Sequence, residues 1–468
     1  MSELIQSLND MVWGAAMLCL IVGTGIFLMV RLKFRPLKNL GFALRQVCSR
    51  RSLSPENTGH GDMTPFESLM TTLAACIGTG NIVGVSSAMV LGGPGALLWM
   101  CVSSVFGLAT IYAESVLGVK YRVTNHKGEM SGGPMYVLKQ RLKPKWLGRA
   151  LAFLFAVFTV LASFGIGNMT QSNSVSEAMF SSFSVPPWIT GLITAALAGI
   201  VILSGVKAIG RVCANLVPVM AILYIVATLV IICLNIRNLP AGLSHILSEA
   251  FSLRAAGGGA MGTVLAQALR WGVARGVFSN EAGLGSAPIA AAAARTDSPA
   301  RQGYINMTGV FFDTIVMCTL TGLAIAASGV LGAADPVTGE ALTGGPLTIA
   351  AFSAALGPAG GYIVTLSLAL FGFSTLIGWG YYGEKALEYL FRSDRARIWY
   401  RVTFIALIFV GATTTMRTVW DFSDAANGLM AVPNLICLLF LSGVVVRETD
   451  AFEVRRRREA RRRGRFRR

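Results

Sequence analysis

Long apolar runs that carry almost no charge follow one another along the whole sequence. A helix of about 20 such residues spans the hydrocarbon core of a bilayer. Hydrophobic residues make up 54% of the 468 residues and charged residues 13%, whereas a soluble domain has about 25% charged residues. The sequence therefore predicts an all-α polytopic membrane protein without a separate soluble domain.

Eleven of these runs are long enough to cross a bilayer, so we expect eleven membrane-spanning helices. Residues 1–12 lack the basic start and the cleavage site of a signal peptide, and we expect the first run to stay as a helix. The expected spans are about 11–31, 64–89, 94–119, 147–180, 187–205, 211–235, 262–293, 302–328, 363–392, 399–416 and 425–446.

The Lys and Arg residues lie mainly on one side of this arrangement. With eleven spans the termini lie on opposite sides, and 34 of the 40 Lys and Arg fall in loops on the side of the C-terminus or in the tail, 447–468. Cytoplasmic loops collect basic residues. We therefore expect a multi-pass protein of a bacterial inner-membrane type, with the N-terminus outside and the C-terminus in the cytoplasm. The tail is expected to contact anionic lipid headgroups rather than nucleic acid.

Two of the eleven runs are interrupted by residues that hydrocarbon disfavours. The run 64–89 contains "IGTGNIVG", with three glycines, Thr79 and Asn81. The run 262–293 contains "SNEAGLGSAP", in which Pro288 strains any continuous helix. Irregular backbone at that depth is tolerated only against protein or a polar cavity. Close helix packing also uses small residues, but packing accounts poorly for Asn81 and leaves the second interruption unexplained.

The positions of the two interruptions predict an internal repeat. Without the first span, the chain divides into five spans over 64–235 and five over 262–446, and each half begins with its interrupted span. An odd number of spans per half inverts the second half relative to the first, as in many secondary transporters. The remaining segments are an extra helix with a basic loop at 1–63 and the tail at 447–468.

A broken helix exposes charge on its backbone in the middle of the membrane. Helix-end N–H groups carry a positive partial charge and helix-end carbonyls a negative one. N–H groups near Thr79 suit a carboxylate, and the carbonyls of Ala74 and Ile77 just before it suit a cation. The small zwitterionic substrate that this implies is an amino acid.

Several segments resemble the alanine or glycine:cation symporter family. Over residues 64 to 446 these segments are "TPFESLMTTLAACIGTGNIVGV", "GGPGALLWM" followed by "ATIYAES", "SGGPMYVLK", "QSNSVSEA", "RGVFSNEAGLGSAP", "FSTLIGWGYYGEKALEYLF" and "NGLMAVPNLICLLFLSGVV". The resemblance implies a sodium- or proton-coupled importer of alanine or glycine, which is not an enzyme and needs no cofactor beyond its coupling ion. It also implies a fold like that of the neurotransmitter sodium symporters, with one extra helix in front.

Roles carried over from the family give a substrate site and a sodium site. Backbone N–H groups would hold the substrate carboxylate, a glutamine would meet the amine, and aromatic rings would wall the pocket; the residues are Thr79, Gly80, Gln171, Phe278, Ser279 and Trp379. Two carbonyls and two hydroxyls would supply the oxygen ligands that a hard cation prefers; the residues are Ala74, Ile77, Ser374 and Thr375. Asn81 is either a second ion ligand or a brace of the break.

Other interpretations of these residues stay open. Gln171 and Ser374 could serve only as bonds between neighbouring helices. The intramembrane acids Glu281 and Asp313 are functional candidates by default. Glu281 could pair with Arg275 or cap a half-helix, and Asp313 could steady an ion site from a distance.

Other functions also stay open at the level of the whole chain. A carboxylate at the ion site would favour protons, and the proposed site has none, which favours sodium. A transporter-like sensor fits the sequence too, whereas no filter loop indicates a channel and the three histidines share no metal spacing. The sequence departs from the family pattern at Val137 and at Gly380, both near but not at the proposed contacts, and the second departure, next to Trp379, could alter the volume of the pocket.

Overall fold

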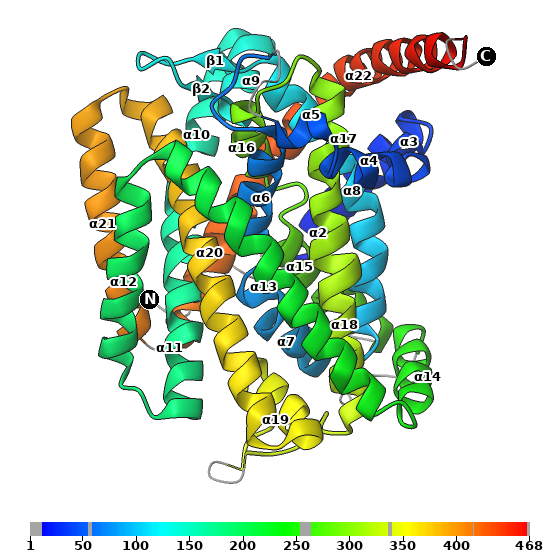
Figure 1. The fold of residues 1–468 in the computed structure, drawn as a ribbon, viewed down its shortest axis with the longest axis vertical. Coiled ribbons are helices and arrows are strands. Elements are labelled where there is room, and N and C mark those ends of the chain that lie inside the picture. Colours follow the sequence, from blue (N-terminus) through cyan, green and yellow to red (C-terminus); the bar gives the residue numbers. More distant parts are fainter. Residues whose placement is uncertain (1–11, 55–58, 253–263, 336–338, 415, 466–468) are drawn as a thin grey trace.

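The computed structural model describes residues 12–54, 59–252, 264–335, 339–414 and 416–465 (Figure 1). Almost all of this part of the chain is helical. The predicted tail, 447–468, is described as far as Arg465, and residues 1–11 and 55–58 of the predicted first segment lie outside the described residues.

The helices and the two short strands fall into four groups by length and continuity. The long helices are α8 (Ala96–Lys120), α10 (Lys145–Phe164) with η2 (Gly165–Met169) and α11 (Thr170–Phe183), α13 (Val206–Leu234), α17 (Pro299–Val310) with η3 (Phe311–Cys318) and α18 (Thr319–Ser328), α20 (Pro358–Phe391), α21 (Asp394–Thr413) and α22 (Met416–Arg465). Shorter apolar helices are α2 (Ala15–Arg31), α12 (Pro187–Leu203) and α19 (Gly344–Leu356). Two interrupted segments are α6 (Pro65–Cys76), η1 (Thr79–Asn81) and α7 (Val83–Leu91), and α15 (Val264–Asn280) with α16 (Ala287–Ala293). Short elements are α3 (Arg35–Lys38), α4 (Leu40–Val47), α5 (Arg50–Leu53), β1 (Val123–Thr124), β2 (Met130–Ser131), α9 (Pro134–Arg141) and α14 (Leu239–Ala250).

Seven helices in the described part of the chain are long and apolar enough to cross a membrane. Residues 11, 262–263 and 415 of the expected spans lie outside the described residues. In the described part, every expected span coincides with helical structure, but several spans are short helices or interrupted segments rather than single long helices. The number of eleven spans therefore stays a prediction. The apolar helix α19 is absent from the expected spans, because its run of 13 residues is too short to cross a bilayer.

Most helices run along the long axis of the molecule (Figure 1). The hairpin β1–β2, α9 and α3 to α5 lie at one end, and α14 and α19 lie at the other. The interrupted segments lie in the interior and are enclosed by their neighbours, with α8 packed on α15, α16 and α17 and with α20 packed on α6, α10 and α11. Helix α13 instead exposes apolar side chains such as Ile222 and Val219 on its outer face, as expected of a helix in contact with lipid.

Candidate substrate and ion site

The first interruption is a sharp break between α6 and α7. Helix α6 begins at a capping box of Thr64 and Glu67 and ends at Cys76, so Glu67 is a helix cap. The backbone of Gly78 is extended, with φ −143° and ψ −150°. A Cβ atom at Gly78 would lie 2.6 Å from Thr375 Oγ1 and 2.9 Å from Gln171 Oε1, so a larger residue at this position would displace these two side chains.

Asn81 hydrogen-bonds both to the backbone of the first break, at Gly78, and to Asp313 in η3. Its Oδ1 accepts a hydrogen bond from the Gly78 N–H at 3.0 Å. Its Nδ2 donates to Asp313 Oδ1 at 2.8 Å and to the Asp313 carbonyl at 3.0 Å. Both ends of the amide are used, which is the arrangement of a brace. Asp313 is fully buried and also accepts from Ser279 Oγ at 2.9 Å, so its carboxylate lies against the break, and its part in an ion site stays a prediction.

The second interruption separates α15 from α16 by a loop of left-handed residues. Glu281, Gly283 and Gly285 have φ values of 59°, 99° and 81°. Pro288 occupies the first turn of α16, where a missing N–H costs nothing. It therefore begins a new helix rather than straining a continuous one.

Glu281 and Arg275 do not pair with each other. Trp379 donates its indole N–H to Glu281 Oε1 at 2.7 Å, and Ser286 donates to Glu281 Oε2. Arg275 instead makes a two-pronged pair with Asp424 of α22, with nitrogen–oxygen distances of 2.6 and 3.2 Å. The pairing of Glu281 with Arg275 is wrong, because the left-handed turn at Glu281 directs its carboxylate to α20.

Four of the six predicted substrate residues, namely Thr79, Gly80, Gln171 and Ser279, lie together at the first break. Gln171 Oε1 accepts a hydrogen bond from the Thr79 N–H at 3.0 Å, and Gln171 Nε2 donates to the Ile166 carbonyl at 2.9 Å. A Cβ atom at Gly80 would lie 3.1 Å from Ser279 Cα and Cβ, so the two interruptions touch here. The Thr79 hydroxyl is buried and has no partner among the described residues, which marks an unmet polar group at the break.

The two predicted aromatic walls have different partners. Phe278 stacks on Trp420 with ring centroids 5.1 Å apart, beneath the Arg275 guanidinium. Trp379 is fully buried and packs against Gly167 of η2, where an added Cβ atom would lie 2.2 Å from the Trp379 Cβ. A Cβ atom at Gly380 would lie 3.1 Å from Ile202 and 3.4 Å from Phe404. The effect of Gly380 on the volume of the pocket stays a prediction.

Four oxygens converge at the end of α6 in the predicted sodium site. Ser374 Oγ lies 3.3 and 3.4 Å from the carbonyl oxygens of Ala74 and Ile77. Thr375 Oγ1 lies 3.1 Å from each of the same carbonyls. Both hydroxyls also reach the Phe371 carbonyl of their own helix, at 2.9 and 3.0 Å. Two hydroxyl hydrogens are thus shared among three carbonyl oxygens. Because acceptors outnumber donors here, the site suits a cation with oxygen ligands.

Sequence reasoning did not predict that Glu114 and Asn434 hold the second break, nor that Asn427 is buried without a partner among the described residues. Glu114 Oε1 accepts from the Gly283 N–H at 3.0 Å and from Asn434 Nδ2 at 2.7 Å. Asn427 is fully buried, and neither end of its amide has a partner among the described residues. These residues are partly indicated by the sequence, since Glu114 is an acid inside a span and Asn427 and Asn434 are polar residues within the last predicted span.

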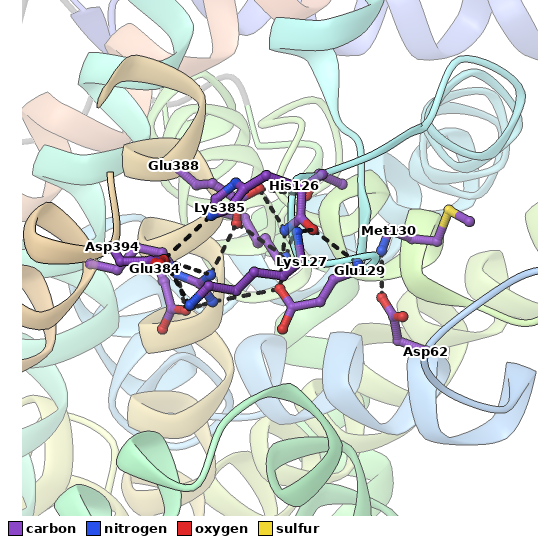
Figure 2. Close-up of polar contacts among 12 residues, drawn as sticks. Asp62, His126, Lys127, Glu129, Met130, Glu384, Lys385, Glu388 and Asp394 are labelled. Carbon is purple, nitrogen blue, oxygen red and sulfur yellow. Dashed lines mark hydrogen bonds and ion pairs between the residues drawn. The ribbon is translucent and has the colours of Figure 1, made fainter. Parts of the chain in front are cut away.

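A polar cluster joins the hairpin β1–β2 to the ends of α20 and α21 (Figure 2). Lys385 Nζ lies 2.9 Å from Glu129 Oε2 and 3.3 Å from Glu388 Oε2. Arg397 donates to Glu384 Oε1 at 2.7 Å. Burial raises the pKa of the Glu129 carboxyl, but Lys385 and Arg397 outweigh burial, so this pKa lies below its usual value.

The polar cluster also reaches the start of the first interrupted segment. Asp62, which precedes α6, accepts the backbone N–H of Met130 at 2.7 Å (Figure 2). Met130 is adjacent to Glu129 in the hairpin, so the cluster and the start of α6 are held by the same short loop. A movement of α6 would therefore strain this end of the molecule.

The chain matches a known family along almost its whole length. Residues 1–466 match the sodium:alanine symporter family. The chain belongs to this family. Similar proteins include the sodium/alanine symporter AgcS of Methanococcus maripaludis, which is 51% identical over 98% of both chains. The probable sodium/glutamine symporter GlnT of Bacillus subtilis is 39% identical over 95% of this chain and 89% of its own.

Membership of the sodium:alanine symporter family confirms the predicted class of protein, a multi-pass membrane transporter of amino acids and not an enzyme. The crystal structure of MhsT in complex with L-phenylalanine has a similar fold, with a TM-score of 0.61, 15% identity, and 84% of this chain and 93% of that chain covered. At this identity the likeness concerns the fold alone. It confirms the predicted fold class.

Proposed function

We propose that this protein imports alanine and glycine together with sodium, and binds the amino acid between the two interrupted segments. The hydrogen bond from the Thr79 N–H to Gln171 Oε1 carries the proposal. It shows that the N–H at the break points at an acceptor oxygen in a buried setting. The substrate carboxylate would take the place of this oxygen, with Gly80 beside Thr79, and the freed Gln171 amide oxygen would accept from the substrate amine.

The size of the substrate would be limited by the aromatic residues and Ser279. Phe278 and Trp379 are both buried and are held by Trp420 and Glu281. A pocket with such fixed walls excludes larger side chains by packing. Packing discriminates one methylene by only about 1–3 kcal/mol, so we expect a graded preference in which alanine and glycine both enter.

Sodium would bind to the carbonyls of Ala74 and Ile77 and to the hydroxyls of Ser374 and Thr375. The excess of acceptors among these oxygens supports this assignment. The bound ion would link the end of α6 to α20. The contacts of Asn81 support its role as a brace, because both ends of its amide already have protein partners.

Transport would follow alternating access by two inverted repeats, 64–235 and 262–446. The pair of Arg275 with Asp424 closes over Phe278 on one side of the break, and the polar cluster ties down the start of α6 on the other. The distribution of basic residues supports a cytoplasmic C-terminus. The polar cluster would then lie on the cytoplasmic side.

Uptake into proteoliposomes tests the proposal. Labelled alanine or glycine is supplied with an inward sodium gradient, or with potassium in place of sodium. We expect saturable uptake only with sodium. Ser374→Ala should raise the sodium concentration for half-maximal uptake. Ser367→Ala should not, because it removes a hydroxyl of the same helix that donates to the Ile363 carbonyl at 2.7 Å. Absence of uptake of both amino acids by folded protein would contradict the proposal.

Proton coupling is the second candidate, and the position of Asp313 favours it. This buried carboxylate accepts hydrogen bonds from Asn81 and Ser279, so a titratable group lies at the break. Uptake driven by a pH gradient without sodium, and lost in Asp313→Asn, would support protons. Sodium-dependent uptake that is indifferent to the pH gradient would exclude them.

A further inference from the structure

A basic cavity lies at the end of the molecule that carries α3 to α5, away from the proposed substrate site. Its volume is about 520 Å³, and it lies between α4, the start of α5, the start of α17 and the end of α22. Four arginines line it against two acids: Arg50, Arg301, Arg455 and Arg456, with Asp297 and Glu459. The lining therefore has an excess of positive charge.

One wall of the cavity is held rigidly by Arg456. Its guanidinium lies 4.4 Å from the centre of the Phe42 ring, and it bonds to Asn39 Oδ1 at 3.1 Å and pairs with Glu453 at 3.3 Å. Its Nη1 is nonetheless buried with no partner among the described residues. Because this Nη1 is buried, it is closed to a ligand in the cavity, and Arg456 contributes the positive charge of its guanidinium to the wall.

Two other arginines leave their charge uncompensated. Arg301 pairs with Asp297 at 3.2 Å, whereas no ion pair among the described residues includes Arg50 or Arg455, which are both exposed at the cavity. These two side chains come from α5 and α22, so they approach the cavity from different elements. Guanidinium groups arranged in this way suit the oxygens of a phosphate.

The surroundings of the cavity point to a lipid as the source of the phosphate. Exposed apolar side chains lie on the same short elements and on α22, namely Leu37, Leu53 and Val454. Basic and exposed apolar side chains on one surface are typical of helices that lie at the membrane interface. Helix α22 also passes without a break from its apolar run into this basic end.

We propose that this cavity binds the phosphate-bearing headgroup of an anionic phospholipid. Arg50 and Arg455 would contact the headgroup, and the charge of Arg456 beside them would add to the attraction for the phosphate. Helix α5 packs on α6, so the lipid would fix an element next to the first interrupted segment. The proposal is independent of the amino acid and the ion that the protein carries.

Native mass spectrometry of the detergent-purified, full-length protein tests the proposal. Phosphatidylglycerol is titrated against phosphatidylcholine, and lipid bound per protein is measured. We expect the wild type to retain phosphatidylglycerol preferentially, and Arg50→Gln/Arg455→Gln to weaken its apparent affinity by about tenfold or more. The control Arg45→Gln/Arg458→Gln removes the same charge from exposed positions of α4 and α22 outside the cavity, and should change the affinity less than about twofold.

Three results would overturn the proposal. Equal losses in the two double variants would indicate diffuse attraction to basic helices rather than a site. Equal retention of both lipids by the wild type would indicate that the headgroup charge is not recognised. Displacement of phosphatidylglycerol by millimolar inorganic phosphate would indicate a site for free phosphate. Unchanged thermal unfolding of the variants is required in each case, so that a loss of binding is not a loss of fold.

Discussion

At the scale of single residues, Gln171 connects η2 to the break through both ends of its amide. Gln171→Ala leaves the buried Thr79 N–H without an acceptor and removes the proposed contact to the substrate amine. An unmet buried donor costs about 1–3 kcal/mol, so we expect uptake at limiting alanine to fall roughly ten- to a hundredfold. Gln140→Ala, which truncates an exposed glutamine bonded to the Tyr121 carbonyl, is the matched control. Unchanged uptake in Gln171→Ala would contradict the assigned pocket.

Substitutions of the glycines at the first break can distinguish a functional role of these residues from simple helix packing. Gly78→Ala places a Cβ atom 2.6 Å from Thr375 Oγ1, whereas an added Cβ at Gly84 has no atom within 4 Å. We expect Gly78→Ala to abolish sodium-dependent uptake and Gly84→Ala to leave it near the wild-type rate. If Gly84→Ala were equally damaging, close helix packing would be the better explanation of this glycine cluster.

The sequence predicted which residues lie at the candidate site better than it predicted which side chains contact one another. The motif segments give Thr79, Gln171 and Ser374 as candidates, and the structure brings them to one region. The partner of Glu281 could not be predicted, because the left-handed turn that aims it at Trp379 depends on packing between α15, α16 and α20. The direction of Gly380 likewise depends on the rotation of α20, which a run of apolar residues does not specify.

At the scale of elements, the second break is held open by a carboxylate from another helix. Glu114 of α8 accepts from the Gly283 N–H and from Asn434 of α22 through one oxygen. Glu114→Ala removes both bonds. It leaves the buried Gly283 N–H without an acceptor, which costs about 1–3 kcal/mol, whereas Asn434 Nδ2 keeps its bond to the Gly283 carbonyl at 2.9 Å. We expect the thermal midpoint of the purified protein to fall by several degrees. Glu114→Gln keeps an acceptor oxygen in the same place and should restore most of the loss; an equal fall in both variants would contradict a role through this acceptor.

The breaks themselves were predictable, since glycine, proline and polar residues in an apolar run have few other uses at that depth. Their partners come from α8, α20 and η3, which lie far from them in the sequence. An acid inside a span indicates a functional or structural site, but the sequence does not say which break it serves. The short apolar helix α19 could not be predicted as an element either, because its 13 residues fall below the length of a span.

At the scale of the whole molecule, most of the basic residues and the polar cluster lie at the same end of the protein. The basic residues predict that this end is cytoplasmic. The cluster there combines Glu129 of the hairpin with Lys385 and Arg397 of α20 and α21. Because these residues come from three elements, their charges hold the loop, the start of α6 and the ends of two long helices in one arrangement.

The state of Glu129 makes the stability of this arrangement depend on pH. Lys385 and Arg397 outweigh burial and hold the Glu129 pKa below its ordinary value of 4.5. A carboxyl with a depressed pKa stabilises the folded state fully above its unfolded pKa, and this contribution is lost as the pH falls through the folded value. The difference in thermal midpoint between the wild type and Glu129→Gln should therefore be constant from about pH 7 to pH 5 and should shrink below about pH 4.5. A wild-type advantage over Glu129→Gln that persists unchanged at lower pH would mean that shape, rather than charge, holds the hairpin against α20.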